Sequence, residues 1–492
     1  MKPIMRSYPD TRLAPVLVAI SLACLMLAQA VLAPSALAAM RKAPYFIYAG
    51  VNTEIRVLWQ LTVADTCTLE WGTDQTYSLG NAETYEFGGD HQHTYLIPNL
   101  VPGTLYYYRV TAGAEQCTGS FRAPPPADAT RLKFFAYGDT RSYPANHSSV
   151  AGAITGAYTQ DAEYQTFILS VGDLVYYGDT EADWDNQFFP AAYPNIRTML
   201  ADMPYQSCRG NHEQTATLFA KYFPYPCVAG RYWSYDYGPA HFAVVDQYTP
   251  YGTGTAQLLW LENDLATTTK PWKFVCLHEP GWSAGGGHAN NTSVQTYVQP
   301  LCEQYDVAIL FAGHNHYYSR AVVNGIQHVT TGGGGAPLAS PVGGYPDVVD
   351  TAKVFHYCKI EIDGGYLYFS AVTPQDSVFD SFMLSLPGAG VEWDRGDDGP
   401  PELMLGTATP NPFDRATTIS YSVSRASQVE VAVYDITGRL VKMLQDRQLD
   451  AGARHAVWDG RDSLGREVSP GIYACRLQAG GSSLTSKVIL LR

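Results

Sequence analysis

FILSVGDLVY, residues 167–176, sets the pattern for the central region of the chain. Its first residues are mostly apolar and include β-branched side chains, and so short a run predicts a buried β-strand. Gly172 and Asp173 follow directly, so a carboxylate lies where the strand ends, and Tyr176 comes three residues later. Because the strands of an open α/β sheet present polar residues at their carboxyl ends, the stretch predicts a layered α/β domain with a polar site at one edge.

The same order recurs along the central region, with polar side chains directly after apolar runs. The five motifs are Gly138-Asp139, Gly172-Asp173-x-x-Tyr176, Gly210-Asn211-His212-Glu213, Val275-x-x-His278 and Gly313-His314-Asn315-His316. Between them, residues 150–158 and 256–265 have the pattern of helices. Strands that alternate with helices and end in polar residues support one α/β domain.

Each motif taken alone has an ordinary structural alternative. A Gly-Asp pair after a strand is commonly a turn, and a lone histidine is more often a satisfied core residue than a ligand. Together, however, the motifs supply carboxylates, an amide oxygen and imidazoles, which suit two hard or borderline cations. A two-metal site clamps the attacking and the leaving oxygen of an in-line displacement. The set therefore favours phosphoryl transfer to water, which depends on positioning and charge neutralisation.

In this order the motifs resemble those of the purple acid phosphatases, within the calcineurin-like metallophosphoesterase superfamily. Tyr318 and Arg320, which follow the last motif, also match that family. The resemblance implies a metal-dependent phosphoric ester hydrolase of the acid phosphatase type, which cleaves small phosphate monoesters by attack of a metal-bound hydroxide. A phosphodiesterase or nucleotide-cleaving enzyme on the same site stays open, as does a catalytically inactive surface binding protein.

The resemblance also implies a role for each residue of the motifs. A ferric ion would be held by Asp139, Asp173, Tyr176 and His316. The second cation, which would be zinc, manganese or ferrous iron, would be held by Asp173, Asn211, His278 and His314. Asp173 would thus bridge the dinuclear centre. His212 and His288 would be catalytic, with His212 stabilising the transition state or protonating the leaving oxygen.

Arg141 makes the first motif unusual. The wider superfamily has Asp-x-His there, whereas the third position here is an arginine, which cannot ligate a cation. We therefore interpret Tyr176 as a compensating ligand, although it could simply pack beside Tyr177. Arg141 could bind a substrate phosphate bidentately or pair with surface carboxylates. His147 could hold a supporting position or contact the substrate.

Two further sheet-rich regions flank the central domain. Before it, short strands around Trp59 and Tyr106-Tyr107-Tyr108 predict a small β-sandwich that resembles a fibronectin type III domain. After it, Asn411-Pro412-Phe413 and Trp458-Asp459-Gly460 resemble the Ig-like sorting domains of exported bacterial proteins, particularly type IX secretion cargo. A generic β-sandwich with an adhesive or spacer role is the alternative for this last region.

The expected fold class is therefore multidomain: a fibronectin type III-like β-sandwich, an α/β four-layer metallophosphoesterase core and an Ig-like β-sandwich. The predicted domains are a signal peptide (1–38), the fibronectin type III-like domain (40–126), the metallophosphoesterase domain (130–385), a linker (386–402) and the Ig-like domain (403–492). A chain of 492 residues is long enough for several such domains.

Basic residues, an apolar run over 13–32 and Ala36-Leu37-Ala38 are typical of a cleaved signal peptide, with a membrane anchor as the alternative. We expect a secreted or cell-surface protein with no stable membrane span after cleavage, exported with the help of bacterial secretion machinery. The net charge of -14 argues against nucleic acid as a structural partner. The eight cysteines that remain after cleavage suggest disulfides, first Cys67–Cys117 and Cys208–Cys227. The oligomeric state is left open.

Overall fold

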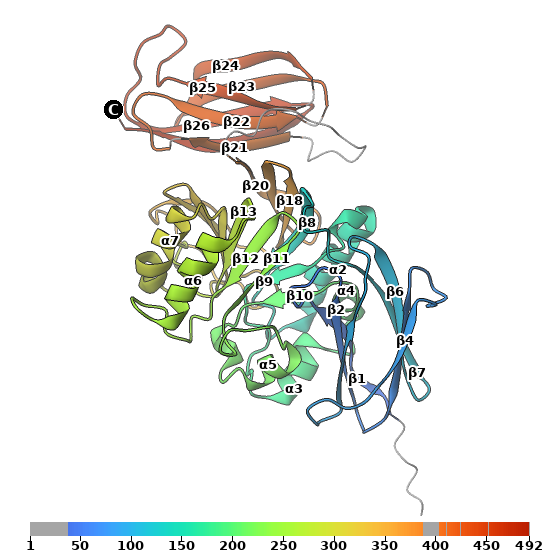
Figure 1. The fold of residues 1–492 in the computed structure, drawn as a ribbon. Helices are drawn as coiled ribbons and strands as arrows, with labels where there is room; N and C mark the ends of the chain where they lie inside the picture. Colours follow the sequence, from blue (N-terminus) through green and yellow to red (C-terminus); the bar gives the residue numbers. More distant parts are fainter. Residues whose placement is uncertain (1–37, 387–402, 410, 424, 451, 492) are drawn as a thin grey trace, which may run out of the picture.

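The computed structural model describes residues 38–386 and 403–491, apart from 410, 424 and 451. Nearly all of the predicted signal peptide (1–38) and linker (386–402) lies outside the described residues. Figure 1 shows three sheet-rich regions in chain order, with the C-terminal strands forming a layer at one end of the molecule. In the described part of the chain, no helix combines the length and apolar character that crossing a bilayer requires.

The N-terminal region is built from two antiparallel sheets. The first contains β1 (Met40–Ile47), β2 (Ile55–Leu61) and β5 (Gln92–Ile97), and the second contains β4 (Gly80–Thr84), β3 (Cys67–Gly72), β6 (Leu105–Ala112) and β7 (Glu115–Arg122). Trp59, around which one of the strands was predicted, is fully buried between them. Lys42 of β1, also fully buried, reaches the central domain, where its Nζ lies 2.6 Å from Oδ1 of Asp185.

Two mixed sheets form the central domain. One has the strand order β10 (Tyr205–Ser207), β9 (Ile168–Ser170), β8 (Arg131–Tyr137), β18 (Tyr357–Asp363), β19 (Tyr366–Val372), β20 (Val378–Ser385). The other has the order β11 (Trp233–Tyr237), β12 (Ala240–Val244), β13 (Trp272–Cys276), β14 (Ile309–Ala312), β16 (Ile326–Thr331), β15 (Tyr318–Val323), β17 (Val348–Ala352). Aromatic rings join the sheets: Phe134 of β8 meets Phe242 and Phe274 of the second sheet edge-on.

The α-helices of the described part of the chain are α2 (Pro144–Gln160), α3 (Glu181–Asp183), α4 (Pro194–Asp202), α5 (Thr217–Tyr222), α6 (Ala256–Thr267) and α7 (Gln299–Gln304). Both predicted helices are confirmed as parts of α2 and α6. Alternate residues of β13 show how the second sheet is covered. Phe274 belongs to the main core, whereas Val275 packs in a separate cluster with Leu261 of α6 and Leu301 of α7.

The C-terminal region is a second pair of sheets. They contain β21 (Leu403–Thr409), β22 (Thr417–Val423) and β25 (Gly452–Trp458) on one side, and β24 (Leu440–Leu449), β23 (Ser427–Asp435), β26 (Gly471–Ala479) and β27 (Ser482–Leu490) on the other. Trp458 lies fully buried in their core against Phe413 and Tyr473. Phe413 and Trp458, which belong to the motifs that suggested this domain, are thus part of its core.

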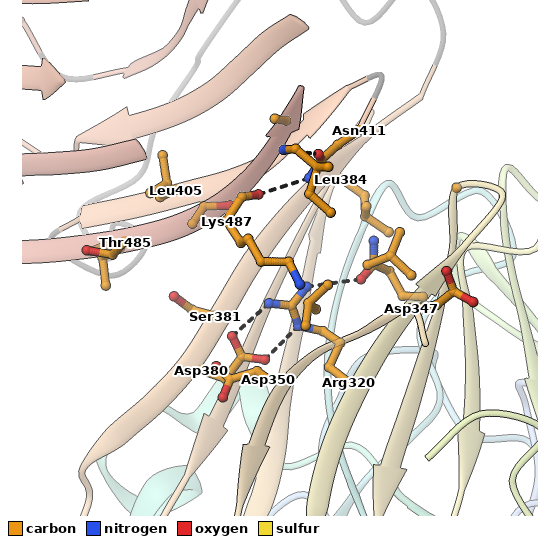
Figure 2. Close-up of a pocket in the computed structure, with 18 of the residues that line it drawn as sticks. Arg320, Asp347, Asp350, Asp380, Ser381, Leu384, Leu405, Asn411, Thr485 and Lys487 are labelled. Atoms are coloured by element: carbon orange, nitrogen blue, oxygen red, sulfur yellow. Dashed lines mark hydrogen bonds and ion pairs between the residues drawn. The ribbon is translucent and has the colours of Figure 1, made fainter. Parts of the chain in front are cut away.

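A cavity of about 870 Å³ lies between the central and C-terminal domains. Figure 2 shows Arg320 of β15 at its wall, in a buried ion pair with Asp380 of β20. Nε and Nη2 of Arg320 donate to the two Asp380 oxygens at 2.6 and 3.0 Å, and the Tyr318 hydroxyl donates to the same carboxylate at 2.6 Å. Tyr318 and Arg320 therefore hold β15 against β20, and none of the predicted metal ligands lines this cavity.

The predicted disulfides are absent, because all eight cysteines in the described part of the chain are free thiols. Cys67 of β3 and Cys117 of β7 pair with opposite edges of β6. Two strand spacings of about 4.8 Å each therefore separate them, which exceeds the reach of a disulfide. The thiol of Cys208 instead contacts that of Cys276, from the other sheet, and the Cys276 thiol also donates to the Ser170 carbonyl at 3.5 Å.

His241 of β12 joins that strand to its neighbours through two carboxylates. Its Nδ1 lies 2.7 Å from Oδ1 of Asp236 on β11, and its Nε2 lies 2.8 Å from Oδ2 of Asp264 on α6. Burial alone would lower the pKa of His241, but the two carboxylates outweigh burial and raise it from 6.5 to about 9. The imidazole is therefore protonated at neutral pH and holds α6 against the sheet.

This raised pKa predicts a pH dependence of stability. The contribution of His241 should be complete below about pH 6.5, where the folded and unfolded states are both protonated, and should be lost as the pH rises through about 9. Between about pH 6 and pH 10 we expect the wild type to lose on the order of 2 kcal/mol of unfolding free energy more than His241→Gln. Urea unfolding of both proteins at the two pH values measures this. Parallel losses would contradict the prediction.

Candidate metal centre

The predicted ligands gather at one edge of the two sheets, because each follows the end of a strand. Asp139 follows β8, Asp173 lies just beyond β9, and His278 and His314 lie just beyond β13 and β14. The strands predicted before these residues are confirmed. Asp139, Asp173 and His314 have positive φ angles of 55, 56 and 65°. Non-glycine residues adopt this left-handed conformation at a cost, which is typical of functional sites.

The glycines of the motifs allow the ligand loops to approach one another closely. A Cβ on Gly210 would lie 2.2 Å from Oδ1 of Asp173, and a Cβ on Gly313 would lie 2.3 Å from Oδ2 of Asp139. Both distances are far below van der Waals contact. Any side chain at either position would therefore push a ligand carboxylate out of place.

One group of donor atoms forms around His278. Its Nε2 lies 3.3 Å from Oδ1 of Asp173, 3.1 Å from Oδ1 of Asn211 and 3.2 Å from Nδ1 of His314. The donor atoms of Asp173, His278 and His314 all lie within 4.8 Å of one another. This group contains the four ligands predicted for the second cation.

A second group shares Asp173 with the first. Donor atoms of Asp139, Asp173 and His316 lie within 4.8 Å of one another, and Nε2 of His316 is 3.5 Å from Oδ1 of Asp139. All three residues are buried. Since Asp173 belongs to both groups, it occupies the position predicted for the bridging ligand. Carboxylate, amide and imidazole donors of this kind fit a pair of hard or borderline cations.

The protein offsets only part of the negative charge of the site's carboxylates. Burial raises the pKa of Asp139 from 3.8 to about 8, with a further contribution from the charge of Asp173. Burial would also raise the pKa of Asp173, but His278 and His212 lower it below its usual value. Burial opposes protonation of His278, yet Asp173 raises its pKa to about 10. Because histidine ligates as neutral imidazole, His278 would have to give up its proton to hold a metal ion here.

His314 and His316 are already suited to ligation. Burial lowers the pKa of His314 to about 2, with help from the neighbouring His278. Burial and the charge of Arg141 lower the pKa of His316 to about 4. Nδ1 of His316 is held 2.9 Å from the carbonyl of Pro337, so its Nε2 is the nitrogen that faces Asp139. Such a carbonyl partner fixes the orientation of a ligand imidazole.

His212 lies at the rim of the same site. Its backbone N–H donates to Oδ1 of Asp173 at 3.0 Å, and its Nδ1 lies 2.6 Å from the carbonyl of Tyr176. Nδ1 therefore carries the proton shared with this carbonyl. Nε2, which is 3.9 Å from Oδ2 of Asp173, faces the site. The position suits proton exchange with a group bound beside Asp173.

His288 also reaches the site, although it comes from an exposed glycine-rich loop. Its ring stacks on that of His314 with 3.8 Å between centroids, and its backbone N–H donates to Oδ1 of Asn315 at 2.6 Å. The structure thus brings both predicted catalytic histidines to the predicted ligands, His212 beside Asp173 and His288 beside His314.

Arg141 and Tyr176 lie together at the first metal position. Nε of Arg141 is 3.4 Å from Oδ2 of Asp173, and its Nη2 donates to Nε2 of His316 at 3.3 Å. The guanidinium carbon lies 5.3 Å from the centre of the Tyr176 ring, which also contacts His212. Arg141 therefore faces the site, which decides against pairing with surface carboxylates. Tyr176 is 39% exposed and lies at the rim.

His147, by contrast, belongs to the core. It is fully buried, its Nε2 lies 2.9 Å from the Tyr137 hydroxyl, and burial lowers its pKa to about 3. His147 therefore cannot contact a substrate, which leaves the supporting role as the one that fits its position.

Three side chains that tie the ligand loops together were not predicted. Glu213 is fully buried and its carboxylate accepts the backbone N–H groups of Asp173, Leu174 and Gly210 at 2.6–3.0 Å. Oε1 of Gln247 accepts from the N–H of His278, and Oε1 of Gln187 accepts from that of Tyr176. For Glu213, its place three residues after Gly210 was a usable signal, since a glutamate at that offset can cap a helical turn.

Comparison with known proteins agrees with this geometry. Residues 132–318 match the family model of the calcineurin-like phosphoesterases, and residues 410–483 match that of the FlgD Ig-like domain. The chain thus carries a calcineurin-like phosphoesterase domain followed by an Ig-like domain, and its class is that of the metal-dependent phosphoester hydrolases.

The similar proteins include plant purple acid phosphatases. Purple acid phosphatase of Glycine max is 27% identical over 351 residues, which cover 65% of this chain and 73% of the relative. Phosphoenolpyruvate phosphatase of Allium cepa is 25% identical over 354 residues, covering 65% and 69%. The purple acid phosphatase PPD1 of yellow lupin seeds has a similar fold, with a TM-score of 0.58 at 21% identity, covering 70% of this chain and 74% of that one.

The relatives differ in how much of their length the match covers and in the activity that their names give. The match to Probable purple acid phosphatase 20 of Arabidopsis thaliana spans 54% of that protein, and two other Arabidopsis relatives carry names that call them inactive. The matches therefore cover between about half and three quarters of the length of these relatives.

Proposed function

We propose that this protein is a secreted dinuclear-metal phosphohydrolase of the purple acid phosphatase type that hydrolyses small phosphate monoesters. The observation that carries the proposal is the pair of donor groups that share Asp173, with His212 facing the shared carboxylate. Two cations held in this way neutralise the charge of a phosphoryl group and make a water molecule acidic enough to attack it.

The residues of the chain then divide the remaining tasks. Asp173 fixes the spacing of the two cation positions, and Glu213 holds the loop of Asp173 to that of Asn211 through backbone hydrogen bonds. The Arg141 guanidinium, at the mouth of the first position, binds a phosphate oxygen by a charge-assisted hydrogen bond. In its doubly protonated form, His212 gives the Nε2 proton to the leaving oxygen and keeps the Nδ1 proton on the Tyr176 carbonyl, and His288 contacts the substrate beside His314.

Finer assignments belong to the same proposal. Tyr176 would help to hold a ferric ion at the first position, and zinc, manganese or ferrous iron would fill the second. The N-terminal sandwich is of the fibronectin type III type, the central domain has four layers, and the C-terminal domain serves export or sorting. Support comes from the rim position of Tyr176 beside Arg141 and from the Ig-like match.

A substrate panel with metal analysis tests the proposal. We expect the purified full-length protein to contain two metal ions per chain and to turn over phosphate monoesters at least about tenfold faster than diesters, in kcat/KM. A chelator should remove the ions and the activity together, and re-addition should restore both. A preference for diesters would favour the phosphodiesterase alternative. Two bound ions with no turnover of any phosphoester would instead indicate a binding protein.

A further inference from the structure

Three tyrosines with exposed side chains lie on two loops that meet beside the metal centre. Tyr143, Tyr176 and Tyr177 are 53, 39 and 51% exposed, and we call them the aromatic rim. Oε1 of Gln187 accepts the backbone N–H groups of Ser142 and Tyr176 at 2.7 and 2.9 Å, which brings the two loops that carry the rim together. Large exposed aromatic residues gathered at one place on a surface commonly mark a binding site.

The rim adjoins His212 directly. The Tyr176 ring lies 5.1 Å from that of His212, and the Tyr177 ring meets that of Tyr176 edge-on, with 4.5 Å between centroids. His212 is the group that hands a proton to the leaving oxygen in the proposed function. A leaving group attached to that oxygen must extend away from the buried carboxylates, and on this side of His212 it meets the rings of Tyr176 and Tyr177.

The positive charge and the exposed aromatic rings lie at different parts of the rim. Arg141 lies at its inner edge, against Asp173 and His316, whereas the ring contact of Tyr177 is with Tyr176. A substrate with an anionic phosphate at one end and a flat ring at the other fits this arrangement. The loop of His288, whose ring packs on His314, begins with Gly285, Gly286 and Gly287, which offer no side chain for a ring to pack on.

We propose that Tyr177 forms a leaving-group subsite that favours phosphate monoesters of planar aromatic alcohols, such as aryl phosphates, over those of small aliphatic alcohols. This inference rests on the proposed function, whose site it extends. Aromatic pairs prefer stacked or edge-to-face contacts. The Tyr177 ring can offer either, because half of its surface is free.

The backbone of Tyr177 makes it a clean position to test. Its N–H donates to Oδ2 of Asp183 at 2.8 Å, and its carbonyl accepts from the N–H of Thr180 at 3.0 Å. These bonds do not involve the ring, so the loop keeps its place when the ring is removed. Tyr177→Phe retains the ring without the hydroxyl, and Tyr85→Ala, at a 63% exposed position in the N-terminal sandwich, is the matched surface control.

The experiment measures kcat/KM of wild type and variants with phenyl phosphate and with ethyl phosphate. Because each variant is compared with wild type on the same substrate, the intrinsic reactivity of the two esters cancels. We expect Tyr177→Ala to lose about threefold to tenfold on phenyl phosphate, mainly through KM, and less than about twofold on ethyl phosphate. Tyr177→Phe and Tyr85→Ala should stay within about twofold of wild type on both.

Equal losses on the two esters, or no loss on either, would overturn the subsite while leaving the proposed function intact. A loss in Tyr177→Phe as large as in Tyr177→Ala would overturn the role of the ring. If the metal-loaded wild type turned over neither ester, the proposed function would fall, and the subsite with it.

Discussion

Asp173→Asn is expected to lose most of its bound metal and at least about a thousandfold in kcat/KM on a phosphate monoester. Loss of partners that only support a metal ligand already costs roughly 10–100-fold in affinity or activity, and Asp173 belongs to both donor groups. Asparagine keeps the shape of the side chain and an oxygen that can accept from the N–H of His212, so the loop should keep its place. The variant lacks the negative charge of the Asp173 carboxylate, which both cation positions share.

Metal analysis after exhaustive dialysis and steady-state kinetics check this result. Asp128→Asn, at an exposed position before β8, is the matched control and should keep both metal and activity. A second readout is proton release. Since Asp173 raises the pKa of His278 to about 10, wild type should release a proton from His278 on metal binding near neutral pH. Asp173→Asn should release less, even at metal concentrations that fill its site. Full metal content with normal turnover would contradict the bridging role.

Much of the site was predictable because its chemistry is local in the sequence. Asp139, Asp173 and His278 each come just after an apolar strand, and parallel strands bring their carboxyl ends to one edge. The position of each motif after a strand was therefore enough to predict that the motifs meet at one edge of the sheets. Arg141 and His147 were ambiguous for the opposite reason. Both follow the first motif closely, and only the fold decides that one faces the site and the other is buried.

The residues that support the ligand loops act through contacts that the spacing of residues in the sequence does not predict. Gln187 and Gln247 lie in segments without a motif, and each finds its backbone partner only after the loops have met. The cysteines are similar. An even count suggested disulfides, but β6 runs between Cys67 and Cys117, and that strand order is a property of the folded sheet. Sequence patterns thus predicted which side chains gather at the strand ends, but not the interactions that position them.

His212→Ala is expected to keep both metal positions while losing about 10²–10⁴-fold in kcat on alkyl phosphates, the range that general acid catalysis contributes. Its ring is absent from both donor groups, and it contacts the carbonyl and the ring of Tyr176 and, more distantly, Asp173. His455→Ala, at an exposed position in the C-terminal domain, controls for loss of a surface histidine. Metal content and kcat measured together separate a proton-transfer role from a ligand role.

The choice of leaving group makes this prediction sharper. An acidic leaving group such as 4-nitrophenol departs as the anion and needs little help from an acid, so His212→Ala should lose much less on 4-nitrophenyl phosphate than on ethyl phosphate. Tyr177→Ala should show the opposite order, because its ring contacts the aromatic leaving group and exchanges no proton. Equal losses on both esters in His212→Ala would indicate that His212 acts on the phosphoryl group. If its loss were larger on the aryl ester, His212 would share the packing role assigned to Tyr177, and the proton would have to come from another group.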